Sequence, residues 1–172
     1  MSSAFLKNET ADGPVVIPAR APLPPNTPNY VTPRGLSLLR AELTELEADH
    51  ARIQTTGVPD DPERTRQLAE LNGRIGALNA RIASARLVEP QQQPTDDVRF
   101  GATITLQAPG QPDWQLTIVG VDEANAAQRR IAFTAPVARS MQGKRLGETV
   151  TLRTPTGERT WQIAAIDYEA DY

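Results

Sequence analysis

The chain contains 172 residues, carries a net charge of −3 and is 39% hydrophobic. This length suits one ordinary domain or two small ones, and the modest hydrophobic content suits an elongated element joined to a small domain. The chain has no cysteine and a single histidine, which excludes disulfides, argues against a structural zinc site and favours a reducing cytoplasm. No apolar run approaches the ~18–20 residues that cross a bilayer, so we expect a soluble protein without a membrane partner.

Basic and acidic residues are balanced along the whole chain. No segment has the strong basic excess of a protein that grips nucleic acid through its phosphates alone. We therefore expect any role with nucleic acid to run through a protein partner.

Residues 1–29 are predicted to form a proline-rich, disordered tail. Proline removes backbone donors and fixes φ, and the apolar residues of this segment follow neither a helical nor a strand period. The prolines are Pro14, Pro18, Pro22, Pro24, Pro25 and Pro28.

Residues 30–90 are predicted to form an antiparallel helical hairpin. Thr32 and Pro33 are typical of an N-cap and a first helical residue. Apolar residues then recur at spacings of three and four in two runs, from Leu36 to Ile53 and from Leu68 to Ala85. Two such seams joined by a short turn indicate a two-stranded coiled coil, with arms of roughly 30 Å.

Two polar features accompany the seams. Glu42 on the first arm is predicted to face Arg74 on the second, in an exposed pair that contributes only ~0–1 kcal/mol. His50 occupies a seam position near the turn. We interpret it as a polar residue tolerated in a thin coiled coil rather than as a proton-transfer or ligand group.

The turn between the arms is acidic. Its sequence, GVPDDPER, places Asp60, Asp61 and Glu63 between and beside two prolines. Asp61 before Pro62 is a good N-cap, and Glu63 in the first turn favours the helix dipole. Capping alone explains Asp61 and Glu63 but leaves Asp60 without a local role. The turn therefore starts the second helix. These residues alone do not decide whether its carboxylates also have a function beyond capping.

Residues 91–97 read as a polar linker, and residues 98–172 as a small α+β domain. The hydrophobic period changes to two in GATITLQA, and WQLTIVGVDE and RIAFTA also read as strands. PVARSMQG opens with a proline and predicts one short helix. GETVTLRTPTGERTWQIAAIDYE predicts a β-hairpin, so that four or five antiparallel strands accompany the helix.

Trp114 and Trp161 are interpreted as core residues that cover one face of this sheet. A stacking platform for nucleic-acid bases is the alternative. We disfavour it because no basic residues are interleaved with the tryptophans in the sequence, as a strand-binding groove requires.

An acidic-tipped helical hairpin followed by a small α+β domain resembles the bacterial GreA/GreB family of transcript-cleavage elongation factors. The resemblance covers roughly residues 29–170 and begins with NYVTPRGLSLLRAEL. It is firmest in APVARSMQGKRLGETVTLRTPTGERTWQIAAIDY, which is similar to the family's Ser-Pro-small-Ala-Arg helix start, Gly-Glu/Asp-x-Val strand and Thr-Pro-x-Gly-Glu turn. It implies an FKBP-like fold for the C-terminal domain.

The resemblance also implies a partner and a shared metal. Family members dock their globular domain at the rim of the RNA polymerase secondary channel, and the coiled coil threads inward. Tip carboxylates there help to hold a second Mg²⁺ and the water that attacks backtracked RNA, so the RNA 3′ end is met only indirectly. The factor is not an enzyme, has no cofactor of its own and acts as a cytoplasmic monomer. By this resemblance Asp60, Asp61 and Glu63 are the candidate metal-assisting residues.

The chain departs from the family pattern at the tip. The family usually has Gly-Asp-x-Ser-Glu-Asn where this chain has GVPDDPER. The hairpin is also about twelve residues shorter than usual, which removes ~9 Å of reach. Mg²⁺ accepts oxygen ligands only at about 2.0–2.1 Å. A tip carboxylate that ends several ångströms short of the ion could not ligate it, and the protein would then not promote cleavage. A channel-binding regulator without cleavage activity is therefore the alternative function.

The resemblance places the docking motif at the start of the short helix. The candidate partner-binding residues are Thr134, Pro136, Val137, Ala138 and Arg139. The family often has an acidic residue where this chain has Thr134. Helix initiation and core packing are the structural alternative for the other four.

Two functions from other classes are alternatives for this sequence. A peptidyl-prolyl isomerase is suggested by the FKBP-like fold alone, and the aromatic residues of this domain barely suffice for its core. The second alternative function is a coiled-coil interaction module with an unrelated protein partner.

Overall fold

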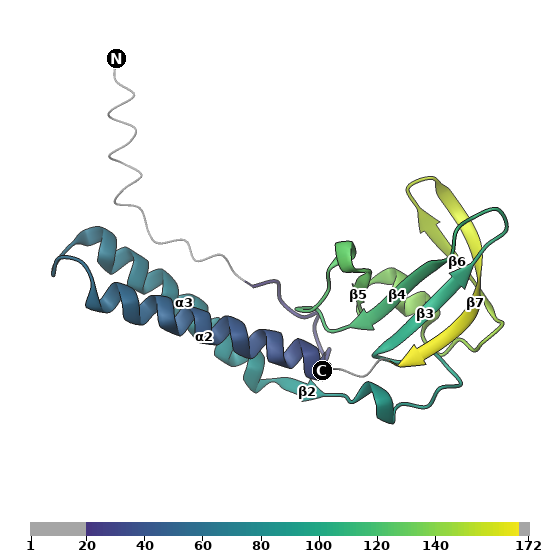
Figure 1. Ribbon diagram of the computed structural model, residues 1–172, viewed down its shortest axis with the longest axis horizontal. Helices are drawn as coiled ribbons and strands as arrows, with labels where there is room; N and C mark the ends of the chain where they lie inside the picture. The colour runs from purple at the N-terminus through teal and green to yellow at the C-terminus, as the bar shows by residue number, and fades with distance from the viewer. Residues whose placement is uncertain (1–19, 169–172) are drawn as a thin grey trace, which may run out of the picture. The chain divides into compact units, whose positions relative to one another are not determined.

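The computed structural model describes residues 20–168 (Figure 1). Residues 1–19, which carry most of the predicted tail, lie outside the described residues, as do residues 169–172. Contacts divide the chain into two compact units, one with Glu42–Ala80 and the other with Leu23–Ala41 and the chain from Arg81 onward. The division into four segments made from the sequence stays a prediction.

The predicted helical hairpin is confirmed. Helix α2 spans Pro33–Thr55 and helix α3 spans Pro62–Ala83. The Thr32 hydroxyl oxygen accepts a hydrogen bond from the Gly35 N–H at 2.9 Å, so Thr32 is the N-cap of α2. Both predicted seams are buried or half-buried, while most of the positions between them are exposed.

The predicted pair between Glu42 and Arg74 is wrong. The Glu42 carboxylate pairs with Arg20 at 2.6 Å, and Arg74 pairs with Glu70 one turn earlier on α3 at 2.9 Å. A partner four residues away on the same helix face is already within reach, whereas a pair across the seam must span the apolar side chains. His50 is half-buried in the seam, as expected.

The C-terminal part of the chain forms one five-stranded sheet with the order β5-β4-β3-β7-β6. The α+β class is confirmed, and helix α4 spans Pro136–Met141 as predicted. The strands are β3 (Ala102–Gln107), β4 (Trp114–Val119), β5 (Arg130–Ala132), β6 (Thr149–Thr154) and β7 (Gly157–Tyr168).

The expectation of a wholly antiparallel sheet needs one correction. The pairs β3–β4, β3–β7 and β6–β7 are antiparallel, but β4 and β5 are parallel. The connection after β4 contains the 3₁₀ helix η2 (Ala126–Gln128) and returns the chain to the middle of β4, where Thr117 is paired with Arg130. Strand β5 therefore runs in the same direction as β4.

Besides η2, three short elements were not predicted. Strand β1 (Asn29–Val31) pairs in parallel with strand β2 (Ala85–Leu87), and the linker contains the 3₁₀ helix η1 (Pro90–Gln92). Segments of three residues are too short to show a hydrophobic period. No helix in residues 20–168 is long and apolar enough to cross a membrane.

The core lies on one face of the sheet, where α4 contributes Ala138 and Met141. Trp161 is 6% exposed, and its ring centroid lies 5.5 Å from that of the partly buried Trp114. Both tryptophans pack in or against the hydrophobic core, so their interpretation as core residues is confirmed.

Candidate functional site

The acidic turn begins the second helix, as its sequence predicts. Helix α3 starts at Pro62, and the Glu63 N–H donates a hydrogen bond to the Asp61 Oδ1 at 3.1 Å. Asp61 is therefore the N-cap of α3. This hydrogen bond involves only Oδ1, so Oδ2 of the same carboxylate is left for another ligand.

Glu63 interacts with its own helix. Its carboxylate lies 3.6 Å from Arg66 and accepts a hydrogen bond from the Gln67 side chain at 3.3 Å. The Glu63 and Arg66 side chains are more than half exposed. Such contacts are weak and exchange readily with water or another partner.

Asp60 differs from the other two acidic residues of the turn. Its φ is 69°, a left-handed conformation that aspartate tolerates better than most residues. It is exposed, and within residues 20–168 its carboxylate makes no hydrogen bond or ion pair. Asp60 thus places a carboxylate at the tip that has no partner in the described chain.

Arg64 holds the turn together, which the sequence analysis missed. Its guanidinium donates hydrogen bonds to the carbonyl oxygens of Ile53 (3.2 Å) and Gln54 (2.5 Å) at the end of α2. These carbonyls have no partner within the helix, and a cationic side chain satisfies both their hydrogen bonds and the negative end of the helix dipole. Asp60 therefore projects from a braced turn.

The tip does not form a metal site by itself. In the part of the chain that the structure describes, no three His, Asp or Glu side chains are grouped so that they could hold a metal ion. Carboxylate oxygens are nevertheless the ligands that Mg²⁺ prefers. The geometry suits a tip that adds one or two oxygens to an ion held mainly by other ligands.

The predicted docking residues surround the start of α4. Pro136 and Arg139 are exposed, and Thr134 is half-buried. Val137 packs partly against the core, and Ala138 is 2% exposed within it. Any direct contact from this motif therefore falls to Thr134, Pro136 and Arg139, whereas Ala138 fits the structural alternative of core packing.

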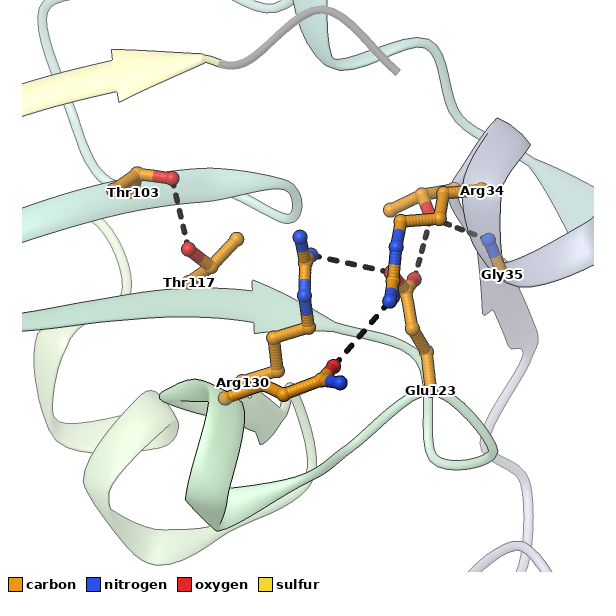
Figure 2. Close-up of polar contacts among 8 residues, drawn as sticks. Arg34, Gly35, Thr103, Thr117, Glu123 and Arg130 are labelled. Carbon is orange, nitrogen blue, oxygen red and sulfur yellow. Dashed lines mark hydrogen bonds and ion pairs between the residues drawn. The ribbon is translucent and has the colours of Figure 1, made fainter. Parts of the chain in front are cut away.

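A second carboxylate centre, missed by the sequence analysis, lies between the start of α2 and the sheet. Figure 2 shows the Glu123 carboxylate between side chains from both elements. It accepts hydrogen bonds from Thr32 Oγ1 (2.5 Å), Arg34 (2.8 Å) and Arg130 (3.2 Å), and only 1% of its side chain is exposed. A Cβ at Gly35 would lie 2.8 Å from the Glu123 Oε1, so any larger residue there would displace the carboxylate.

Other contacts support the same joint. Arg81 at the end of α3 pairs with Asp122 at 3.2 Å, with both side chains largely buried. The rings of Tyr30, Phe100 and Phe133 form a cluster with centroids 5.5–5.8 Å apart. The base of the helical hairpin is thus packed into the same unit as the sheet.

Comparison with known proteins agrees with this architecture. The family described as "Transcription elongation factor, GreA/GreB, C-term" matches residues 93–168. The transcription elongation factor GreB of Neisseria meningitidis serogroup B is 33% identical over 155 residues, which cover 83% of this chain and 95% of the relative. This chain belongs to the GreA/GreB family of transcription elongation factors.

Relatives of both family branches match over similar lengths. GreB of Pseudomonas aeruginosa is 31% identical over 87% of this chain and 95% of its own length. GreA of Acidiphilium cryptum is 33% identical over 80% of this chain and 96% of its own length. The helical hairpin therefore belongs to the GreA/GreB match along with the sheet.

The Glu123 centre and the Arg64 brace have no local signature in the sequence. Thr32-Pro33-Arg34-Gly35 was interpreted only as a helix start, although its hydroxyl and guanidinium also bind Glu123. That contact joins residues about ninety positions apart, so no local pattern could reveal it. Arg64 likewise reads as an ordinary surface arginine until the turn brings it back to the end of α2.

Proposed function

We propose that this GreA/GreB family protein binds bacterial RNA polymerase at the rim of the secondary channel and promotes cleavage of backtracked transcripts. The polymerase remains the enzyme, and this protein, acting as a cytoplasmic monomer, supplies carboxylate ligands from the tip of its hairpin. Contact with the RNA 3′ end is indirect, through the shared metal and its water.

The observation that carries this proposal is the state of Asp60. It is exposed, lies at the tip and has no partner in the described chain, and its backbone is held at a φ of 69°. The N-cap hydrogen bond of Asp61 and the brace from Arg64 already stabilise the turn. The Asp60 carboxylate is therefore not needed for capping and is available to a ligand.

The chemistry follows from the ligand type. When bound, Mg²⁺ shared with the polymerase would activate a water and neutralise charge on the phosphodiester. Asp60 would supply the first oxygen to this ion, and the Asp61 Oδ2 the second. Glu63 would orient water, because its weak contacts with Arg66 and Gln67 exchange readily.

The docking contact is assigned to the exposed part of the α4 start. Pro136 presents an apolar ring and Arg139 a cation, with Thr134 beside them. Val137 and Ala138 position these residues by packing on the core. Pro136→Ala together with Arg139→Ala should weaken binding to the polymerase without unfolding the sheet.

A channel-binding regulator without cleavage activity is the second candidate. The observation in its favour is that both Asp61 and Glu63 have partners inside α3, so capping accounts for two of the three carboxylates. A hairpin with ~9 Å less reach fits the same function. Such a protein would occupy the channel and alter initiation, pausing or substrate entry.

The test is RNA cleavage in a stalled, backtracked elongation complex with a 5′-labelled transcript. Binding of the protein to the polymerase is measured in parallel, so that failure to bind is separated from failure to cleave. Shortened transcripts that appear only with the protein support the first function. Binding without cleavage supports the second, and no binding contradicts both.

A further inference from the structure

A cavity of about 370 Å³ is lined by residues of the β3–β4 connection and of the β6–β7 hairpin. Figure 1 shows both segments at the edge of the sheet. Its lining includes Trp114, Trp161, Arg153 and Arg159. This volume is within the range of roughly 300–1,000 Å³ that is typical of small-ligand sites. No residue of the tip or of the α4 start lines the cavity, so its role is independent of the proposed function.

The two tryptophans give the cavity an aromatic wall. Their rings are tilted by 58° with centroids 5.5 Å apart. Trp161 is 6% exposed, and its indole N–H is buried without a hydrogen-bond acceptor in the described chain. A buried N–H without an acceptor is unfavourable, and most native structures satisfy it with protein, water or ligand.

Two arginines add positive charge to this wall. Arg159 precedes Trp161 by two residues in β7 and therefore lies on the same face of the strand. It is half-buried, and within residues 20–168 it makes no hydrogen bond or ion pair. Arg153 has only a loose pair with Glu158 at 3.6 Å, and 85% of its side chain is exposed.

One carboxylate also lines the cavity. Asp113 accepts a hydrogen bond from the Gln107 side chain at 3.3 Å, so part of its hydrogen-bonding capacity is already used. The two guanidinium groups exceed this single negative charge, and the cavity favours an anion.

From the sequence alone, a stacking platform is disfavoured because no basic residues are interleaved with the tryptophans as a strand-binding groove requires. That reason was wrong for the folded chain. The β6–β7 hairpin brings Arg153 and Arg159 to the cavity that Trp114 and Trp161 line. Arg159 lies two residues before Trp161 on β7, and Arg153 comes from the neighbouring strand β6.

We propose that this cavity binds a nucleoside phosphate, with the base against Trp114 and Trp161 and the phosphate on Arg159 and Arg153. A base supplies a flat ring that can stack on the indoles. A phosphate matches the fork of donors on a guanidinium. An apolar side chain of a protein partner would leave the positive charge of the arginines unused.

The chain offers a direct readout for this site. It contains two tryptophans, and both line the cavity. An amide–proton correlation spectrum of the ¹⁵N-labelled full chain therefore shows two indole N–H signals, each of which reports on the cavity. The titrants are adenosine and uridine monophosphates, the matching nucleosides, inorganic phosphate, a six-residue oligouridylate and an acidic hexapeptide that contains leucine.

We expect both indole signals to shift saturably with a monophosphate and at least tenfold more weakly with the nucleoside or with inorganic phosphate. Arg159→Ala should weaken binding about tenfold or more, because a charge-assisted contact is lost. Arg86→Ala, an exposed arginine of β2 outside the lining, is the matched control and should leave binding unchanged. Trp161→Phe keeps an aromatic ring without the N–H and should weaken binding less than Arg159→Ala.

The remaining outcomes separate the sources of the ligand. Equal affinity per site for monophosphate and oligouridylate assigns the site to free nucleotides, and much tighter oligouridylate binding assigns it to a single strand. No shift with any nucleotide at 10 mM, or shifts only with the acidic peptide, would overturn the proposal. Equal binding of inorganic phosphate and monophosphate would also overturn it, because the base would then contribute nothing.

Discussion

The carboxylates of Asp60 and Glu123 have opposite environments in one chain. Glu123 is buried and bonded to Thr32, Arg34 and Arg130, whereas Asp60 is exposed at the tip and has no partner among residues 20–168. A buried carboxylate with several partners is part of the structure, since its removal strands the opposite charges. An exposed carboxylate on a braced turn adds little to stability and is available for function.

The largest expected effect comes from the buried centre. Glu123→Gln keeps the shape but replaces the carboxylate that pairs with Arg34 and Arg130 by a neutral amide, and we expect a loss of about 3 kcal/mol in the free energy of unfolding. Urea unfolding followed by tryptophan fluorescence measures it, because both tryptophans lie in the sheet unit. Glu158→Gln, in an exposed pair with Arg153, is the control and should change stability by less than about 0.5 kcal/mol. Equal losses of stability in Glu123→Gln and Glu158→Gln would show that the buried carboxylate stabilises the fold no more than an exposed one.

The next largest effect is expected at Asp61, where two substitutions separate the N-cap hydrogen bond from the negative charge of the side chain. Asp61→Ala removes the acceptor for the Glu63 N–H, and we expect α3 to lose about 1 kcal/mol. Asp61→Ser retains a capping oxygen without the carboxylate and should lose only a few tenths. Hydrogen exchange of the first turn of α3 measures both. Equally fast exchange in both variants would show that the negative charge, rather than the hydrogen bond, stabilises the turn.

A smaller effect concerns Tyr168 at the end of β7. Its hydroxyl donates to the Asp97 carbonyl at 2.9 Å and accepts from the Arg99 N–H at 3.1 Å. Burial is the main cause that raises the pKa of Tyr168 above its ordinary value of 10.0. A raised pKa means that the folded state favours the neutral phenol, so this contribution is present below about pH 10 and is lost as pH rises through the folded pKa.

Tyr168→Phe tests that contribution. The variant should be about 1 kcal/mol less stable at pH 7, and it should lose less further stability than the native chain when the pH is raised above about 10. Urea unfolding at a series of pH values measures the difference. Parallel stability curves for the two proteins would contradict the assignment.

Much of this architecture could be predicted because it follows local rules. The coiled-coil seams, both N-caps and the short helix at Pro136 all depend on residues a few positions apart. The Glu123 centre, the brace from Arg64 and the approach of Arg153 to the tryptophans depend on contacts that only the folded chain creates. The parallel entry of β5 was missed for the same reason, since its direction is set by the path of the preceding connection.

The candidate site was predicted as a set of residues but not as an arrangement. The acidic turn was found, and its division into a cap, a helix-bonded glutamate and a partner-free aspartate required the structure. At the start of α4, the motif alone could not distinguish the buried Ala138 from the exposed Pro136 and Arg139.

The central claim is that Asp60 is a functional carboxylate and not a structural one. Asp60→Asn tests it most directly, because asparagine tolerates the left-handed backbone and has the same shape but lacks the charge. The measurement is cleavage of 5′-labelled RNA in a backtracked elongation complex, at matched occupancy of the polymerase. We predict a loss of cleavage of roughly tenfold or more, with thermal stability unchanged. Full cleavage by Asp60→Asn at equal occupancy would contradict the claim.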